Sequence, residues 1–120
     1  MADATLGQRG EAAAARWYLK NGYRLLEHNY KTRFGELDLI LQKKNQIIIA
    51  EVKTRSPSMW YRPMDAVHPA KQQRIILATQ RYLQSNDLLD ASIRFDVMEV
   101  IPREQGGFLV RCIPDAFQAG

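Results

Sequence analysis

The chain has 120 residues, one cysteine and a formal net charge of +4, and it is 46% hydrophobic and 25% charged. These values fit a single globular domain over 1–120, and no apolar run approaches the roughly 20 residues that span a bilayer. Cys112 alone excludes an internal disulfide and a cysteine zinc cluster. The N-terminus has no secretory pattern, so we expect a cytoplasmic protein without membrane contact, and the basic balance favours polyanionic partners.

The first half of the chain predicts one helix and three strands. Consecutive alanines and helical spacing of apolar residues predict a helix over 5–21, with Thr5 as its N-cap and Gly22 as its stop. The segment 23–32 is a predicted strand. The segment 35–55 reads as two more strands joined by a short polar turn.

The second half predicts one helix and two strands. Three prolines and no clear period indicate a loop over 56–69, and a helix follows from 69 to about 85. Alternating residues predict a strand over 92–102, and a turn with two glycines leads to a last strand over 106–114. We expect 115–120 to be frayed. The fold class is therefore mixed α/β, in the order α-β-β-β-α-β-β.

The strands of 35–55 carry charged residues where folding alone would not place them. Because side chains alternate along a strand, Glu36 and Asp38 share one face and the leucines between them share the other. Folding the hairpin after Lys44 places Asp38 opposite Glu51 and Glu36 opposite Lys53. A shift of one residue in this register would separate the two acidic side chains.

Two carboxylates about 5 Å apart repel each other by roughly 4 kcal/mol at an effective dielectric constant near 20. The amine of Lys53, a shared proton or a divalent cation could offset this repulsion. Carboxylate oxygens are the ligands that Mg²⁺ prefers, and such an ion with a nearby lysine supports phosphodiester hydrolysis. Alternating charges on a solvated sheet face, or on an edge hairpin protected from aggregation, would give the same pattern.

Several short motifs together resemble a known family. Asp38, followed thirteen positions later by Glu51-Val52-Lys53, resembles the D…ExK core of the PD-(D/E)XK nuclease superfamily. The wider set resembles the bacterial YraN family of predicted nucleases, which is similar to archaeal Holliday-junction resolvases. Its motifs are GQRGE at 7–11, HNYKTRFGELDLI at 28–40, AEVKTR at 50–55, KQQRI at 71–75 and RFDV at 94–97.

The resemblance implies a restriction-endonuclease-like fold, in which a central mixed sheet is flanked by helices. It implies that Asp38 and Glu51 bind Mg²⁺ or Mn²⁺, that Lys53 is the catalytic lysine, and that Glu11 is an additional acidic ligand. Leu37 stands where the superfamily often has proline. The family also often places a supporting glutamine near 72–73, and the choice between these two residues stays open.

Other charged residues have several interpretations. Basic residues around the acidic centre could hold DNA phosphates. The candidates are Arg33, Arg55, Arg62, Lys71 and Arg74. Asp96 in the strand 92–102 could bond a helix end, support Lys53, or lie exposed. Gly7 and Gly10 in a predicted helix suggest close backbone approach to the sheet or to a phosphate, and a frayed helix start would give the same pattern.

The expected function is hydrolysis of phosphodiester bonds by a divalent-metal-dependent DNA endonuclease, with branched or single-strand-containing DNA as candidate substrates. The alternative is a non-catalytic nucleic-acid-binding or assembly module that retains the nuclease fold. A structural domain that dimerises through the hairpin also stays open. A homodimer would suit two cleavages on opposed strands.

Overall fold

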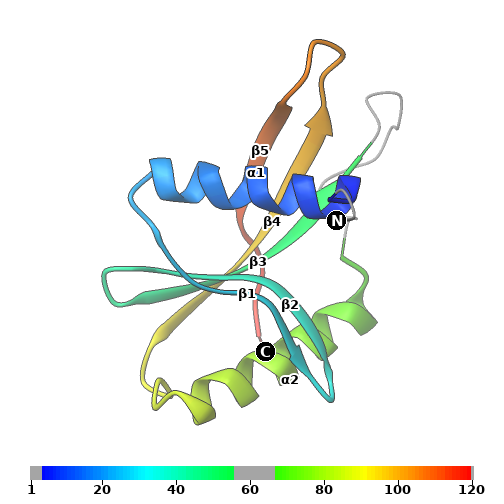
Figure 1. Ribbon diagram of the computed structural model, residues 1–120. Coiled ribbons are helices and arrows are strands. Elements are labelled where there is room, and N and C mark those ends of the chain that lie inside the picture. Colours follow the sequence, from blue (N-terminus) through cyan, green and yellow to red (C-terminus); the bar gives the residue numbers. More distant parts are fainter. Residues whose placement is uncertain (1–3, 56–66, 120) are drawn as a thin grey trace.

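A five-stranded mixed sheet lies between two helices (Figure 1). The computed structural model describes residues 4–55 and 67–119. The elements follow the predicted order: α1 (Leu6–Lys20), β1 (Arg24–Thr32), β2 (Gly35–Lys43), β3 (Gln46–Thr54), α2 (Pro69–Ser85), β4 (Ser92–Pro102) and β5 (Phe108–Phe117). The sheet order equals the chain order, and only β3 and β4 are parallel. The predicted mixed α/β class is therefore confirmed.

Local signals set the ends of both helices. Thr5 and Gln8 form a reciprocal capping box at the start of α1, and Gly22, with φ of +86°, follows its end. The side chain of His68 caps α2 directly before Pro69. Because these signals are local in sequence, the predicted boundaries of both helices agree closely with the structure.

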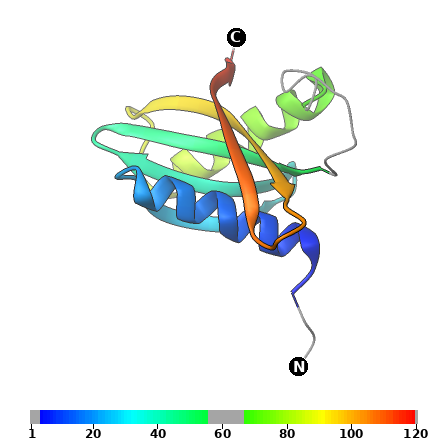
Figure 2. The same cartoon turned by 90° about the horizontal axis from the view of Figure 1, so that it is seen from above.

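The sheet separates two apolar layers, one beneath each helix (Figure 2). Along β3, Ile47 and Ile49 pack in the layer beneath α2, whereas Ile48 and Ala50 pack in the layer beneath α1. β4 alternates in the same way, because side chains of a strand point to opposite faces in turn. We call these two sides of the sheet the α1 side and the α2 side.

β2 departs from the predicted alternation. Leu39 lies on the α1 side, but Leu37 joins Ile40 in the layer on the α2 side. The prediction that the leucines of this strand share one face is therefore wrong at Leu37. Leu37 and Leu39 are two residues apart yet pack on opposite sides, so the strand twists around Asp38. This irregularity helps to position the candidate site.

The C-terminal strand is longer than predicted. β5 continues to Phe117, which is 8% exposed and stacks on Phe95 with ring centroids 4.8 Å apart. The expected fraying from 115 onward is wrong for the first three of these residues. The register of β4 and β5 shifts between Phe95 and Val97, and Asp115 has φ of +53°. This bulge returns the strand to the core, which the local sequence does not reveal.

The predicted loop over 56–69 lies mostly outside the described residues, and so does Arg62. Val67, directly before the cap of α2, is buried in the layer on the α2 side. None of the helices in the described ranges is long and apolar enough to cross a bilayer.

Candidate functional site

The two strands that carry the acidic motif separate at the motif itself. The ladder between β2 and β3 runs from Lys43 and Gln46 to Leu39 and Ala50, which is the predicted register. It ends there, one pair before Asp38 and Glu51. Asp38 therefore does not face Glu51 as a backbone pair, although the two residues follow each other at the end of the ladder.

The side chain of Asp38 lies where the ladder would have continued. Its Oδ2 accepts a hydrogen bond of 2.8 Å from the backbone N–H of Val52 in β3. Because the β2–β3 ladder ends before Glu36, which pairs only with Lys31 in β1, the predicted pairing of Glu36 with Lys53 is wrong. The twist of β2 thus directs the carboxylate of Asp38 toward β3 at the position where the two strands separate.

Glu51 is the most deeply buried acidic residue of this motif, with 1% of its surface exposed. Its Oε1 lies 3.0 Å from Nζ of Lys71 in the first turn of α2. Its Oε2 is buried and has no hydrogen-bond partner among the described residues. Burial, followed by the charge of Asp38, raises the pKa of Glu51 to about 7, although Lys71 and Lys53 oppose this shift. Near neutral pH the carboxyl group can therefore hold or release a proton.

Two amines lie beside the carboxylates and have opposite pKa shifts. Burial, and then the neighbouring amine of Lys71, lower the pKa of Lys53. Burial, the largest single cause, also lowers the pKa of Lys71, but the charge of Glu51, hydrogen bonds to Lys53 and Glu51 and the charge of Asp38 together outweigh it, so the net shift is upward. Lys71 is therefore the more persistent cation, and Lys53 gives up its proton more readily.

Glu11 approaches the same region from α1. Burial, followed by the charges of Asp38 and Glu36, raises the pKa of Glu11. With its amide nitrogen turned toward the carboxylates, Asn29 donates to Glu11 at 2.7 Å and to Glu36 at 2.8 Å. Asn29, with φ of +50° in β1, thus connects two acidic side chains, and the sequence analysis did not identify it.

A close contact between α1 and β3 positions Glu11. A Cβ atom on Gly10 would overlap with Oγ1 of Thr54, so only glycine permits this approach. The backbone of α1 therefore lies directly on the strand that carries Glu51. The close approach predicted from the two glycines is therefore confirmed at Gly10, whereas a Cβ atom on Gly7 would meet only Oγ1 of Thr5, at an ordinary 3.9 Å.

A hollow of about 500 Å³ between α1 and β1 borders Glu11. Its lining is mainly apolar and includes Leu25, Leu39, His28 and Arg16, but neither Asp38 nor Glu51. We call Asp38, Glu51 and the two amines beside them, Lys53 and Lys71, the acidic centre. It is compact, because Lys71 occupies the space beside Glu51.

The predicted phosphate-contacting residues are distributed over several places. Arg33 lies over the ring of Phe34, 4.8 Å from its centroid, near the turn between β1 and β2, and Arg74 is exposed on α2. Arg55 directly follows β3, where its backbone N–H bonds the carbonyl of Val100. Lys71, by contrast, belongs to the acidic centre. The spacing of Lys71, Ile75 and Thr79 in the sequence could have shown that Lys71 faces the sheet.

Of the two glutamines near the start of α2, Gln72 is partly buried and donates to the carbonyl of Val67 at 2.9 Å. Gln73 is exposed. Gln72 is therefore the one that supports local structure next to Lys71.

Glu99 was not among the site residues predicted from the sequence. This residue pairs with Lys53 in the parallel register of β3 and β4, is 6% exposed, and has a buried Oε2 without a partner among the described residues. Its position between the apolar residues Met98 and Val100 was the available signal, because a charged residue seldom occupies a central strand.

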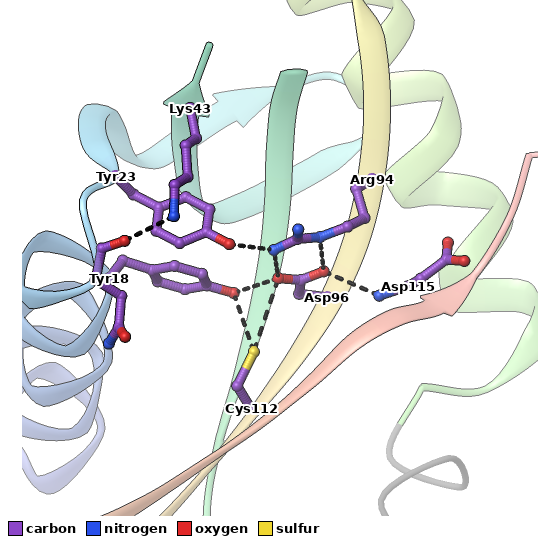
Figure 3. A network of polar contacts seen from close by, with 8 residues as sticks. Tyr18, Tyr23, Lys43, Arg94, Asp96, Cys112 and Asp115 are labelled. Carbon is purple, nitrogen blue, oxygen red and sulfur yellow. Dashed lines mark hydrogen bonds and ion pairs between the residues drawn. The ribbon is translucent and has the colours of Figure 1, made fainter. Parts of the chain in front are cut away.

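Asp96 lies on the α1 side of the sheet in a separate network (Figure 3). Arg94 donates to both of its oxygens at 2.8 Å, and Tyr18 of α1 donates to Oδ2 at 2.7 Å. The backbone N–H of Asp115 bonds Oδ1 at 3.0 Å, and the thiol of Cys112 lies 3.8 Å from Oδ2. Asp96 is thus buried and fully partnered, and it neither lies exposed nor supports Lys53, which contacts Lys71 on the α2 side.

The donor set of the acidic centre fits a hard divalent cation. Among the described residues, no three His, Cys, Asp or Glu side chains are arranged as a group that could hold a metal ion. Mg²⁺ in particular is commonly held by one or two carboxylates, with water and substrate phosphate completing its coordination. The unpartnered Oε2 of Glu51 and the adjacent carboxylate of Asp38 match this requirement.

Comparisons with known proteins identify the family. A UPF0102 protein from Myxococcus xanthus is 40% identical over 95% of this chain and 90% of its own length. Another from Flavobacterium psychrophilum is 42% identical over 93% of this chain and 92% of its own length. One from Caldanaerobacter subterraneus is 44% identical over 80% of this chain and 79% of its own length. Residues 10–100 match the family described as "Uncharacterised protein family UPF0102", and the chain therefore belongs to UPF0102, to which the YraN resemblance pointed.

Proposed function

We propose that the protein is a divalent-metal-dependent DNA endonuclease whose centre is formed by Asp38, Glu51 and Lys53. The observation that carries the proposal is the environment of Glu51. Its carboxylate is buried, has one oxygen without a partner among residues 4–55 and 67–119, and has a pKa raised to about 7 by burial and by Asp38. A buried acidic group with so few partners costs stability, which is typical of residues retained for function.

Asp38 and Glu51 would hold the ion, Mg²⁺ or Mn²⁺, with Glu11 as the acidic residue on its α1 side. A bound ion would polarise the phosphate and lower the pKa of its water ligand. Lys53, whose own pKa is lowered by burial and by Lys71, would accept a proton from water or orient it. Lys71 holds Glu51 in place before the ion binds and is positioned to contact a phosphate oxygen.

Branched or single-strand-containing DNA remains our candidate substrate class. A non-catalytic nucleic-acid-binding module is the second candidate, and the ion pair between Lys71 and Glu51 favours it. In such a module, the amine would permanently neutralise the carboxylate, and no ion would be needed.

A panel of DNA substrates tests the proposal. Linear, flapped and four-way DNA would be incubated with purified protein and Mg²⁺ or Mn²⁺, and products would be separated on denaturing gels. We expect metal-dependent cleavage of at least one structure. Glu51→Gln, Asp38→Asn and Lys53→Gln should each reduce its rate by at least about 100-fold.

Exposed residues provide the matched controls. Glu104→Gln and Lys44→Gln remove one charge of each sign outside the proposed centre and should leave the rate unchanged. Equal inactivity of the wild type and Glu51→Gln on every substrate, with DNA affinity retained, would favour the binding module instead.

A further inference from the structure

A basic surface lies on the other flank of α1 from Glu11. A groove of about 320 Å³ separates the C-terminal half of α1 from the hairpin of β4 and β5, and Figures 1 and 2 show that hairpin beside the helix. Three cations line it, Arg16 and Lys20 from the helix and Arg103 from the hairpin, together with the rings of Trp17 and Phe108. None of the lining residues is acidic.

The cations of this groove are not neutralised by acidic residues in the described part of the protein. Within the described ranges, neither Arg16, Lys20 nor Arg103 forms an ion pair, whereas Lys71 and Arg94 do. All three side chains are exposed. Like charges held together in this way repel one another, so an anionic partner would stabilise their arrangement.

Arg16 lines both this groove and the hollow that borders Glu11, so its side chain lies between the two. Glu11 and Lys20 are separated by nine residues, or about 14 Å along the helix at about 1.5 Å per residue. This length corresponds to roughly four base pairs of duplex at about 3.4 Å each.

We propose that this groove, formed by Arg16, Lys20 and Arg103, binds the phosphodiester backbone of DNA on the far side of α1 from the acidic centre. Its guanidinium and ammonium groups are the kind of side chain that binds DNA phosphates. The proposal rests on the proposed function for its choice of DNA as the partner, but not on cleavage. It adds a contact region that the predicted set of Arg33, Arg55, Arg62, Lys71 and Arg74 does not include.

Binding measurements without divalent metal test the groove separately from cleavage. Fluorescence anisotropy with labelled flapped DNA in EDTA would compare the wild type with Arg16→Gln/Arg103→Gln over a range of salt concentrations. We expect the double variant to bind at least about tenfold more weakly at low salt and to reduce the slope of log affinity against log salt by about 2.

The matched control is Arg24→Gln/Lys44→Gln, which removes the same charge from exposed positions on β1 and the turn after β2. It should change neither affinity nor slope beyond the small effect of net charge. Equal losses in both double variants would overturn the proposal, as would no loss in Arg16→Gln/Arg103→Gln. Thermal unfolding should show both variants folded, because all four side chains are exposed.

Competition distinguishes DNA from an acidic peptide. Polyglutamate at equal charge concentration should displace the labelled DNA poorly, and equal displacement would overturn the assignment to phosphodiesters. Failure of cleavage with loss of binding in Arg16→Gln/Arg103→Gln would reject the nuclease and keep the groove. Cleavage by the wild type with unchanged binding in this variant would keep the nuclease and reject the groove. The groove would also be rejected if the wild type bound no DNA.

Discussion

Two buried carboxylates, on opposite sides of the same sheet, have very different surroundings. Asp96 on the α1 side is 0% exposed and receives hydrogen bonds from Arg94, Tyr18 and the backbone of Asp115. Glu51 on the α2 side is 1% exposed, has one ion pair with Lys71, and retains an oxygen without a partner in the described part of the chain.

The difference separates a carboxylate that serves the fold from one that is available for chemistry. A buried charge is stabilised only when donors surround it, and the chain supplies Asp96 with donors from α1, β4 and β5. At Glu51 the same need is met in part, which leaves its pKa raised to about 7. The expected effects below, ordered by size, test this contrast.

Asp96→Ala should have the largest effect on stability. It would leave Arg94, the Tyr18 hydroxyl and a backbone N–H without their acceptor, and we expect a loss of about 3–5 kcal/mol in the free energy of unfolding. Denaturant unfolding followed by circular dichroism measures this value. The exposed Glu104→Ala should change it by less than about 0.5 kcal/mol. A loss below about 1 kcal/mol for Asp96→Ala would contradict the structural role of the network.

Glu51→Gln should change the pH dependence of stability. The pKa of Glu51 is raised from 4.5 to about 7 in the folded protein, so the folded state keeps a proton that the unfolded chain releases. This contribution to stability is fully present below about 4.5 and is lost as the pH rises through about 7. Glu51→Gln has no carboxyl group to titrate, so its free energy of unfolding does not fall in this way. Between pH 4.5 and 7 it should therefore rise by up to roughly 3 kcal/mol relative to that of the wild type.

Unfolding curves from pH 4.5 to pH 8.5 provide the measurement. The curve of Glu104→Gln should run parallel to that of the wild type, because its side chain is exposed. A constant difference between Glu51→Gln and the wild type over the whole range would show that Glu51 titrates normally in the folded state.

Added Mg²⁺ should have the smallest effect. At ten times its dissociation constant, an ion that binds only the folded state stabilises it by about 1.4 kcal/mol, which raises the melting temperature by a few degrees. We expect this rise for the wild type and Asp96→Asn, and its loss in Glu51→Gln and Asp38→Asn. Sodium chloride at equal ionic strength is the control. A rise that survives in Glu51→Gln would place the ion elsewhere.

Local signals were sufficient to predict most of the fold. The N-cap Thr5, the helix-starting Pro69 and the alternation in β3 and β4 gave the elements and their order, and the turn near Lys44 gave the register of the hairpin. Such features depend on neighbouring residues, so a single sequence contains them. The sequence also predicted that Asp38, Glu51 and Lys53 form one cluster, both from their spacing and from the family resemblance.

Tertiary structure decided how those residues meet. Three contacts join segments that are apart in the chain. They are the hydrogen bond from Val52 to Asp38, the ion pair of Lys71 with Glu51, and the hydrogen bond from Asn29 to Glu11. Docking of the helices also determined that Asp96 is enclosed by donors, while one oxygen of Glu51 has no partner in the part of the chain that the structure describes. Periodicity assigns a side chain to a face of the sheet, but its partners depend on strand twist and helix packing, which only the complete fold fixes.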